Sequence, residues 1–114
     1  MKKRPNYIEQ VHDLTRLIPY GRVTTYGTIA DFLALGSARM VGWALNKSFI
    51  VEGVPAHRVV NRKGELSGRI HFSSPTMMQE LLEAEGVEVE NDKVKNFKEV
   101  YWHPEMEMDD PRLK

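Results

Sequence analysis

The sequence Pro55-Ala56-His57-Arg58-Val59-Val60-Asn61 decides how the fold of this chain is interpreted. Proline fixes its own φ angle, so Pro55 predicts an entry turn, and Val59-Val60 is typical of a short buried strand. His57 and Arg58 would then lie at the junction between the turn and the strand. Taken alone, the heptapeptide is also consistent with an ordinary loop-to-strand transition that holds a core histidine. The surrounding sequence has to distinguish the two interpretations.

The N-terminal part predicts one amphipathic helix. An Asn-x-x-Glu pattern from Asn6 to Glu9 is typical of a capping box, and Pro19 ends the helix. Apolar side chains recur at helical spacing and predict one buried face, formed by Ile8, Val11, Leu14, Thr15 and Ile18.

Two shorter helices, joined by a turn, predict a helix-turn-helix. The first covers about 26–35 after a cap at Thr24 or Thr25, and the second covers about 38–47 after a cap at Ser37. The second helix carries small residues on its outer face, which would let its backbone approach a groove closely. The long side chain among them is Arg39.

The remainder of the chain predicts a small β wing and one more helix. Residues 61–65 read as a hairpin turn with Arg62 and Lys63 at its tip. A polar loop at 70–75 over the rim of a pocket and a helix over 76–85 follow. The alternation from residue 87 to residue 90 predicts a terminal strand or hairpin. We expect residues 1–5 and 105–114 to be frayed.

Four motifs, in this order, resemble the DNA-binding domain of the O6-alkylguanine-DNA alkyltransferases. In that family the central motif is Pro-Cys-His-Arg, and its cysteine accepts the alkyl group. Here Ala56 stands in place of the cysteine, so the chain resembles the alkyltransferase-like branch, which binds the lesion without repairing it. The motifs are Ile18-Pro19-Tyr20-Gly21-Arg22-Val23-Thr24-Thr25-Tyr26-Gly27-Thr28-Ile29-Ala30, Ala38-Arg39-Met40-Val41-Gly42, the central heptapeptide and Leu81-Leu82-Glu83-Ala84-Glu85-Gly86.

The resemblance implies a fold and a set of DNA contacts. The expected fold is mainly α with a small β wing: a winged helix-turn-helix like the alkyltransferase C-terminal domain, in one domain over 1–114. Arg39 matches the family's arginine that enters the duplex through the minor groove, and Tyr26 matches its tyrosine beside the target phosphate. The expected DNA-binding residues are Tyr26, Ser37, Ala38, Arg39, Gly42 and Arg62.

A lesion pocket is expected around the position of the missing nucleophile. The alanine leaves an apolar recess that a flipped O6-alkylguanine could enter, and Arg69 stands where true alkyltransferases usually have a tyrosine. His57 and Glu85, which activate the cysteine in active enzymes, are expected to be structural, and no residue is expected to be catalytic. The predicted pocket residues are Tyr26, Pro55, Ala56, Val59 and Arg69.

The predicted function is recognition of O6-alkylguanine in double-stranded DNA by nucleotide flipping, which flags the lesion for nucleotide excision repair proteins. Net charge is zero, yet residues 1–75 hold 11 Lys and Arg against 5 Asp and Glu, and residues 76–114 hold 5 against 11. This asymmetry favours a basic face for phosphates and an acidic segment turned away.

Composition limits the other classes of function. The chain contains no cysteine, which excludes disulfides and thiolate metal sites, and no apolar run is long enough for a transmembrane helix. No hydrophobic stretch follows the basic residues 2–4, so we expect no signal peptide. We expect no cofactor, no metal, no membrane, a monomer, and a cytoplasmic location that is nucleoid-associated if the source is bacterial.

Three alternatives stay open at this point. The chain could be a Cys-to-Ala variant of an active alkyltransferase, although Arg69 and the total lack of cysteine argue against it. A winged-helix transcription regulator would need polar base-reading side chains on its recognition helix, and residues 38–43 supply few. A metal-dependent hydrolase is disfavoured because the histidines at 12, 57, 71 and 103 show no ligand spacing.

Overall fold

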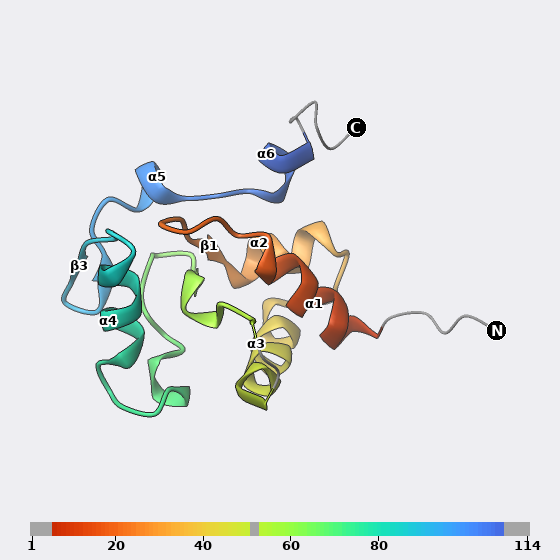
Figure 1. Ribbon diagram of the computed structural model, residues 1–114. Coiled ribbons are helices and arrows are strands. Elements are labelled where there is room, and N and C mark those ends of the chain that lie inside the picture. Colours follow the sequence, from red (N-terminus) through yellow and green to blue (C-terminus); the bar gives the residue numbers. More distant parts are fainter. Residues whose placement is uncertain (1–5, 51–52, 109–114) are drawn as a thin grey trace.

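The structure, a computed structural model, describes residues 6–50 and 53–108 (Figure 1). Helices dominate it, and the strands are only two residues long. The order of elements is α1 (Tyr7–Arg16), β1 (Thr24–Thr25), α2 (Tyr26–Phe32), α3 (Ala38–Asn46), η1 (Lys47–Ile50), η2 (Ala56–Arg58), β2 (Val59–Val60), η3 (Arg69–His71), α4 (Met77–Ala84), β3 (Val89–Glu90), β4 (Lys93–Val94), α5 (Phe97–Val100) and α6 (Pro104–Met108).

Helix α1 begins where its cap predicts. The Asn6 side-chain oxygen accepts a hydrogen bond from the Glu9 amide at 2.9 Å, which satisfies one of the free N–H groups of the first turn. On the buried face, His12 Nε2 donates to the Ala44 carbonyl of α3 at 2.7 Å. This bond joins α1 to α3 while it satisfies a buried ring.

Helix α2 begins at its predicted cap and ends three residues early. Thr25 Oγ1 accepts from the Thr28 amide at 3.0 Å. At the other end Ala34 adopts a φ of 57°, and the Leu35 amide donates to the Ala30 carbonyl at 2.8 Å. These are the features of a Schellman motif, here with alanine at the left-handed position that glycine usually occupies. Helix α3 follows after Ser37, whose side chain makes no capping hydrogen bond.

Strand β2 separates two hydrophobic cores. It pairs in parallel with β1, with Thr24 opposite Val59 and Thr25 opposite Val60. Because successive side chains of a strand point to opposite faces, Val59 packs with α1, α2 and α3, whereas Val60 packs with α4 and the C-terminal hairpin. The segment that carries the central motif is therefore fixed from both sides.

The wing differs from its prediction. Asn61 closes the turn, because its side-chain oxygen accepts from the amides of Lys63 and Glu65 at 3.0 and 2.8 Å. The turn does not lead into a second strand of a wing: Glu65 instead forms a single bridge with Lys93. Arg62 is exposed in this turn.

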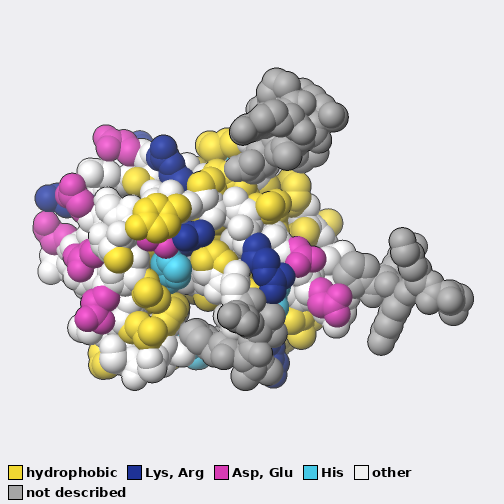
Figure 2. All heavy atoms as spheres, in the orientation of Figure 1, with side chains coloured by type: hydrophobic (Ala, Val, Ile, Leu, Met, Phe, Trp, Pro, Cys, Tyr) yellow, Lys and Arg dark blue, Asp and Glu magenta, His cyan; other side chains and the backbone are white. Residues whose placement is uncertain are grey.

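The C-terminal part follows its predicted order. Helix α4 and the antiparallel pair β3–β4 correspond to the predicted helix and hairpin. Figure 2 shows acidic side chains gathered over α4 and β3, at the left of the view. The predicted fraying from residue 105 is wrong as far as residue 108, because Pro104–Met108 forms α6. Residues 1–5 and 109–114 lie outside the described residues. None of the described helices is both long and apolar enough to cross a membrane.

Candidate functional site

The three successive side chains of the turn η2 point in two different directions. Ala56 is 9% exposed and lines a cavity, whereas His57 and Arg58 turn toward Glu85 at the C-terminal end of α4. Pro55 precedes this turn and Val59 continues it into β2. The central motif thus has one face on a cavity and one face on a cluster of charged groups.

The cluster of charged groups, formed by His57, Arg58 and Glu85, is mostly buried, with side chains 6 to 16% exposed. His57 Nε2 lies 2.6 Å from Glu85 Oε2, and Arg58 donates to both carboxylate oxygens, at 2.8 to 3.1 Å. The Gly21 amide donates to Glu85 Oε1 at 2.9 Å, and Arg58 also donates to the Ile18 carbonyl at 2.9 Å. The cluster therefore joins α4, η2 and the turn after α1.

Hydrogen bonds decide the charge state of Glu85. Burial alone would raise the pKa of its carboxyl group, but the bonds from Arg58, the Gly21 amide and His57 lower it to about 2. Burial is the main cause that lowers the pKa of His57, against the opposing effect of Glu85. A neutral His57 that donates from Nε2 to a Glu85 carboxylate is consistent with both directions. No thiol lies beside this pair to be activated.

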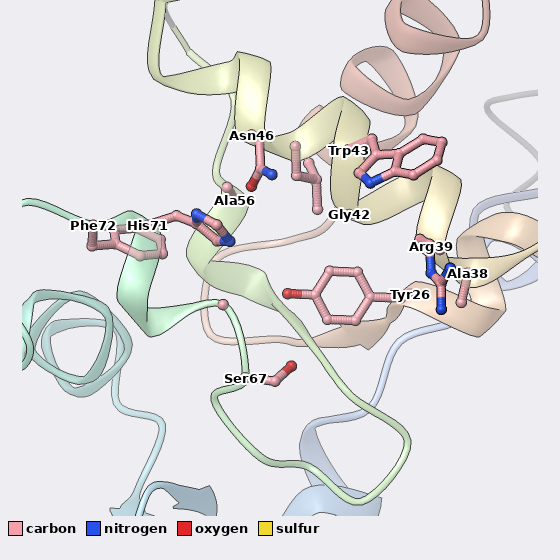
Figure 3. Close-up of a pocket in the computed structure, with 12 residues that line it drawn as sticks. Tyr26, Ala38, Arg39, Gly42, Trp43, Asn46, Ala56, Ser67, His71 and Phe72 are labelled. Atoms are coloured by element: carbon pink, nitrogen blue, oxygen red, sulfur yellow. The ribbon is translucent and has the colours of Figure 1, made fainter.

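The cavity on the other face has a volume of about 470 Å³, within the range of small-molecule sites. Figure 3 shows Tyr26 on one side of it and His71 and Phe72 on another, and Ala56 also lines it. Helix α3 forms the remaining side. The lining residues are Tyr26, Ala38, Arg39, Gly42, Trp43, Leu45, Asn46, Ala56, Ser67, Gly68, His71 and Phe72.

Tyr26, the first residue of α2, reaches across to the segment before η3. Burial raises the pKa of its phenol, and a hydrogen bond with the Ser67 side chain opposes that shift. A Cβ at Gly68 would lie 2.7 Å from the Tyr26 hydroxyl, so the close approach depends on glycine. The phenol therefore remains protonated and able to donate at neutral pH.

The α3 side of the cavity combines small residues with one cation. A Cβ placed on Gly42 would meet no atom within 4 Å, so the helix backbone is open to a ligand there. Arg39 is exposed and makes no hydrogen bond or ion pair with any residue that the structure describes. Its guanidinium is thus available to a partner.

The structure brings together only part of the predicted set. Tyr26, Ala38, Arg39, Gly42 and Ala56 line the same cavity. Ser37 is exposed just before α3, and Arg62 is exposed in the turn after β2.

Three predicted pocket residues do not line the cavity. Val59 is fully buried in the hydrophobic core, and Pro55 lies before η2 outside the lining. Arg69 instead donates to the Leu66 carbonyl at 3.1 Å and lies 3.8 Å from an Asp92 carboxylate oxygen. The Asp92 carboxylate and the Leu66 carbonyl account for the placement of Arg69 outside the lining of this cavity.

The lining also includes residues that the sequence did not reveal. Ser67, Gly68, His71 and Phe72 come from an irregular segment and η3, which have no periodic pattern that could mark them. Trp43 did carry a signal, because it follows Arg39 by four residues on a helix.

A second hollow of about 470 Å³ shares Ala56, His71 and Phe72 and is otherwise lined by Ser48, Val54, His57, Ser73, Met77 and Leu81. Within the described ranges, no three His, Cys, Asp or Glu residues form a group that could hold a metal ion.

The chain belongs to the family described as 6-O-methylguanine DNA methyltransferase, DNA binding domain, whose model matches residues 6–87. It is 36% identical, over 103 residues, to Alkyltransferase-like protein 1 of Schizosaccharomyces pombe, with 86% of this chain and 95% of that protein covered. It is also 36% identical over 92 residues to the DNA base-flipping protein of Escherichia coli, with 78% of this chain and 68% of that protein covered.

A solved structure confirms the fold class. The crystal structure of S. pombe Atl1 in complex with damaged DNA containing O6-carboxymethylguanine matches with a TM-score of 0.78 at 33% identity, covering 90% of this chain and all of that one. The resemblance to alkyltransferase-like proteins is confirmed. With Ala56 at the acceptor position and no cysteine in the sequence, the chain holds no thiol that could accept an alkyl group.

Proposed function

We propose that this chain recognises O6-alkylguanine in duplex DNA by taking the flipped base into the cavity beside Ala56 and holding it there unreacted. The observation that carries the proposal is the juxtaposition of a cavity of about 470 Å³, a methyl group at the acceptor position and, on the adjoining helix, an arginine with no partner among the described residues. The relatives support it: S. pombe Atl1 forms a complex with damaged DNA, and the E. coli relative is named a base-flipping protein.

Helix α3 supplies the contacts that would offset the cost of flipping. Extruding a base costs a few kcal/mol of stacking and pairing energy, and the cost is least where pairing is already weak. Ala38 and Gly42 let the α3 backbone approach the minor groove, and the Arg39 guanidinium can stack in the gap that the base leaves.

Tyr26 would act on the flipped nucleotide from the opposite side. Its pKa is raised by burial, so the phenol is a hydrogen-bond donor across the physiological range. A phenol that donates a hydrogen bond suits a phosphate oxygen of the target nucleotide.

Recognition without transfer has a consequence for repair. A methyl group offers no nucleophile, so the alkylated base leaves the cavity unchanged. We therefore propose that the bound, monomeric protein hands the lesion to nucleotide excision repair proteins.

Paired titrations test lesion recognition. Fluorescent duplexes that differ only in guanine against O6-methylguanine are titrated with the protein, and we expect tighter binding to the modified duplex. Equal affinities would falsify the proposal. Sequence-selective binding to undamaged DNA would favour a transcription regulator instead.

Two variants at one position test the role of Ala56. Ala56→Leu fills the cavity and is expected to remove the preference for the modified duplex, while binding to unmodified DNA persists. Ala56→Cys restores a thiol beside His57 and Glu85. Vigorous methyl uptake by Ala56→Cys would support an alkyltransferase that has lost only its nucleophile.

A further inference from the structure

Trp43 is a large apolar side chain that the fold leaves in water. It lies on α3, is 56% exposed, and makes no hydrogen bond or ring contact with any described residue. The buried face of α3 is filled by Val41, Ala44 and Leu45. Packing of the protein therefore does not explain the indole.

The position of Trp43 connects it to the proposed site. Residues four apart on a helix are neighbours on its surface, so Arg39 and Trp43 form one ridge. Figure 3 shows both side chains on α3, at the edge of the cavity, with Gly42 between them in the sequence. The open space at Gly42 lies beside this ridge, and it leaves room for a nucleotide against the helix.

We infer that Trp43 stacks on a nucleobase of the bound DNA at the mouth of the cavity, beside Arg39. Every base offers a π-face, and stacking of a base on an aromatic side chain stabilises binding without sequence preference. An indole next to a guanidinium gives the ridge one flat cation and one flat neutral surface. The inference rests on the proposed DNA binding and adds a base-stacking residue to it.

Intrinsic fluorescence reports on Trp43 directly. The chain contains two tryptophans, and Trp102 is only 3% exposed. Bound DNA should quench the emission of the wild-type protein. Trp43→Phe leaves Trp102 as the only tryptophan, so the quenching of tryptophan emission should disappear in that variant. Unchanged emission on saturation with either duplex would overturn the inference.

Affinity shows whether the contact stabilises the complex. Trp43→Ala should weaken binding about 5- to 150-fold, the range that corresponds to loss of one base–aromatic stack. Trp43→Phe, which keeps an aromatic ring, should lose only a few-fold. Leu17→Ala is the matched control, because Leu17 is also 56% exposed but does not line the cavity.

The outcomes separate this inference from the proposed function. If the wild-type protein prefers the modified duplex and Trp43→Ala binds it equally well, the stacking inference fails and lesion recognition stands. If the wild-type protein shows no preference for the modified duplex, lesion recognition fails. The role of Trp43 is then decided on unmodified DNA, by fluorescence quenching together with the loss of affinity in Trp43→Ala. Quenching without a loss of affinity in Trp43→Ala also overturns the inference.

Discussion

Arg58 and Arg39 have the same side chain and opposite surroundings. The Arg58 side chain is 16% exposed, donates to both oxygens of the Glu85 carboxylate and to the Ile18 carbonyl, and lies 5.7 Å from the centre of the Tyr20 ring. Arg39 stands exposed at the rim of the cavity with no partner among the described residues. The Arg58 guanidinium makes its hydrogen bonds within the fold, whereas the Arg39 guanidinium is available to a ligand.

The difference locates function on one face of the central motif. Arg58 lies within the motif that resembles a reactive centre, yet its hydrogen bonds join three parts of the chain. Arg39 lies in a different helix, and its free donors face the same cavity as Ala56. Motif membership therefore does not by itself identify the side chains that contact a ligand.

The largest expected effect is on stability, at the buried carboxylate. Glu85→Gln removes the charge that Arg58 and His57 face, and breaking a buried pair in this way costs on the order of 3 kcal/mol. We expect a marked decrease in the free energy of unfolding, measured by urea denaturation. Glu83→Gln, two residues earlier on α4 and exposed, is the control and should change stability little. A Glu85→Gln protein as stable as the control would show that the cluster is not structural.

The same cluster predicts how stability depends on pH. Glu85 has a folded-state pKa of about 2 against 4.5 in the unfolded chain, so between these values the unfolded state binds more protons. The contribution of Glu85 to stability should be fully present above about pH 5 and be lost as the pH falls toward 2, by about 3 kcal/mol in total. Because the pKa of His57 is also lowered in the folded state, the unfolded state binds more protons at this residue below pH 6.5. The contribution of His57 to stability therefore also falls as the pH falls. Denaturation at pH 3 and pH 5 should show this loss in the wild type and a much smaller one in Glu85→Gln.

Arg39→Ala should produce the opposite pattern to Glu85→Gln. The free energy of unfolding should stay within about 0.5 kcal/mol of the wild type, as for most exposed residues. Affinity for the modified duplex should fall about ten-fold or more, since a stacked guanidinium is lost. Arg39→Lys keeps the charge but not the planar group and should rescue little.

Lys98→Ala on α5 is the matched control for this loss of charge, because Lys98 does not line the cavity. If Lys98→Ala and Arg39→Ala weaken binding equally, the effect of Arg39 is only general electrostatics.

The smallest effect is expected at Arg62. This side chain is exposed in the turn after β2 and suits a phosphate contact. Arg62→Ala should weaken binding a few-fold to modified and unmodified duplexes alike and lower the slope of log affinity against log salt by about 1. A selective loss on the modified duplex would instead place Arg62 at the lesion.

Local signals predicted the helices well, and their ends less well. Asn6 and Thr25 carried the capping chemistry that begins α1 and α2. The early end of α2 was missed because Ala34 occupies the left-handed position, where the sequence offers no glycine to mark it. Alanine does not favour this left-handed conformation, and the helices on either side, α2 and α3, hold Ala34 in it.

Long-range contacts explain the remaining differences. The parallel pairing of β2 with β1 joins residues more than thirty positions apart, so the sequence suggested a local hairpin in its place. Arg69 was assigned to the pocket by its match to a family position, and nothing near it in the sequence reveals its ion pair with the carboxylate of Asp92. The resemblance to a family indicated Tyr26, Arg39 and Ala56, whereas no local pattern in the sequence marks His71 and Phe72, which line the cavity through the fold.

A crystal structure of the protein with a duplex that contains O6-methylguanine tests the central claim most directly. The account predicts that the modified base lies inside the cavity, in contact with the Ala56 methyl group, with Arg39 in the space that the base has left. A modified base still stacked in the duplex, beside an empty cavity, would contradict it.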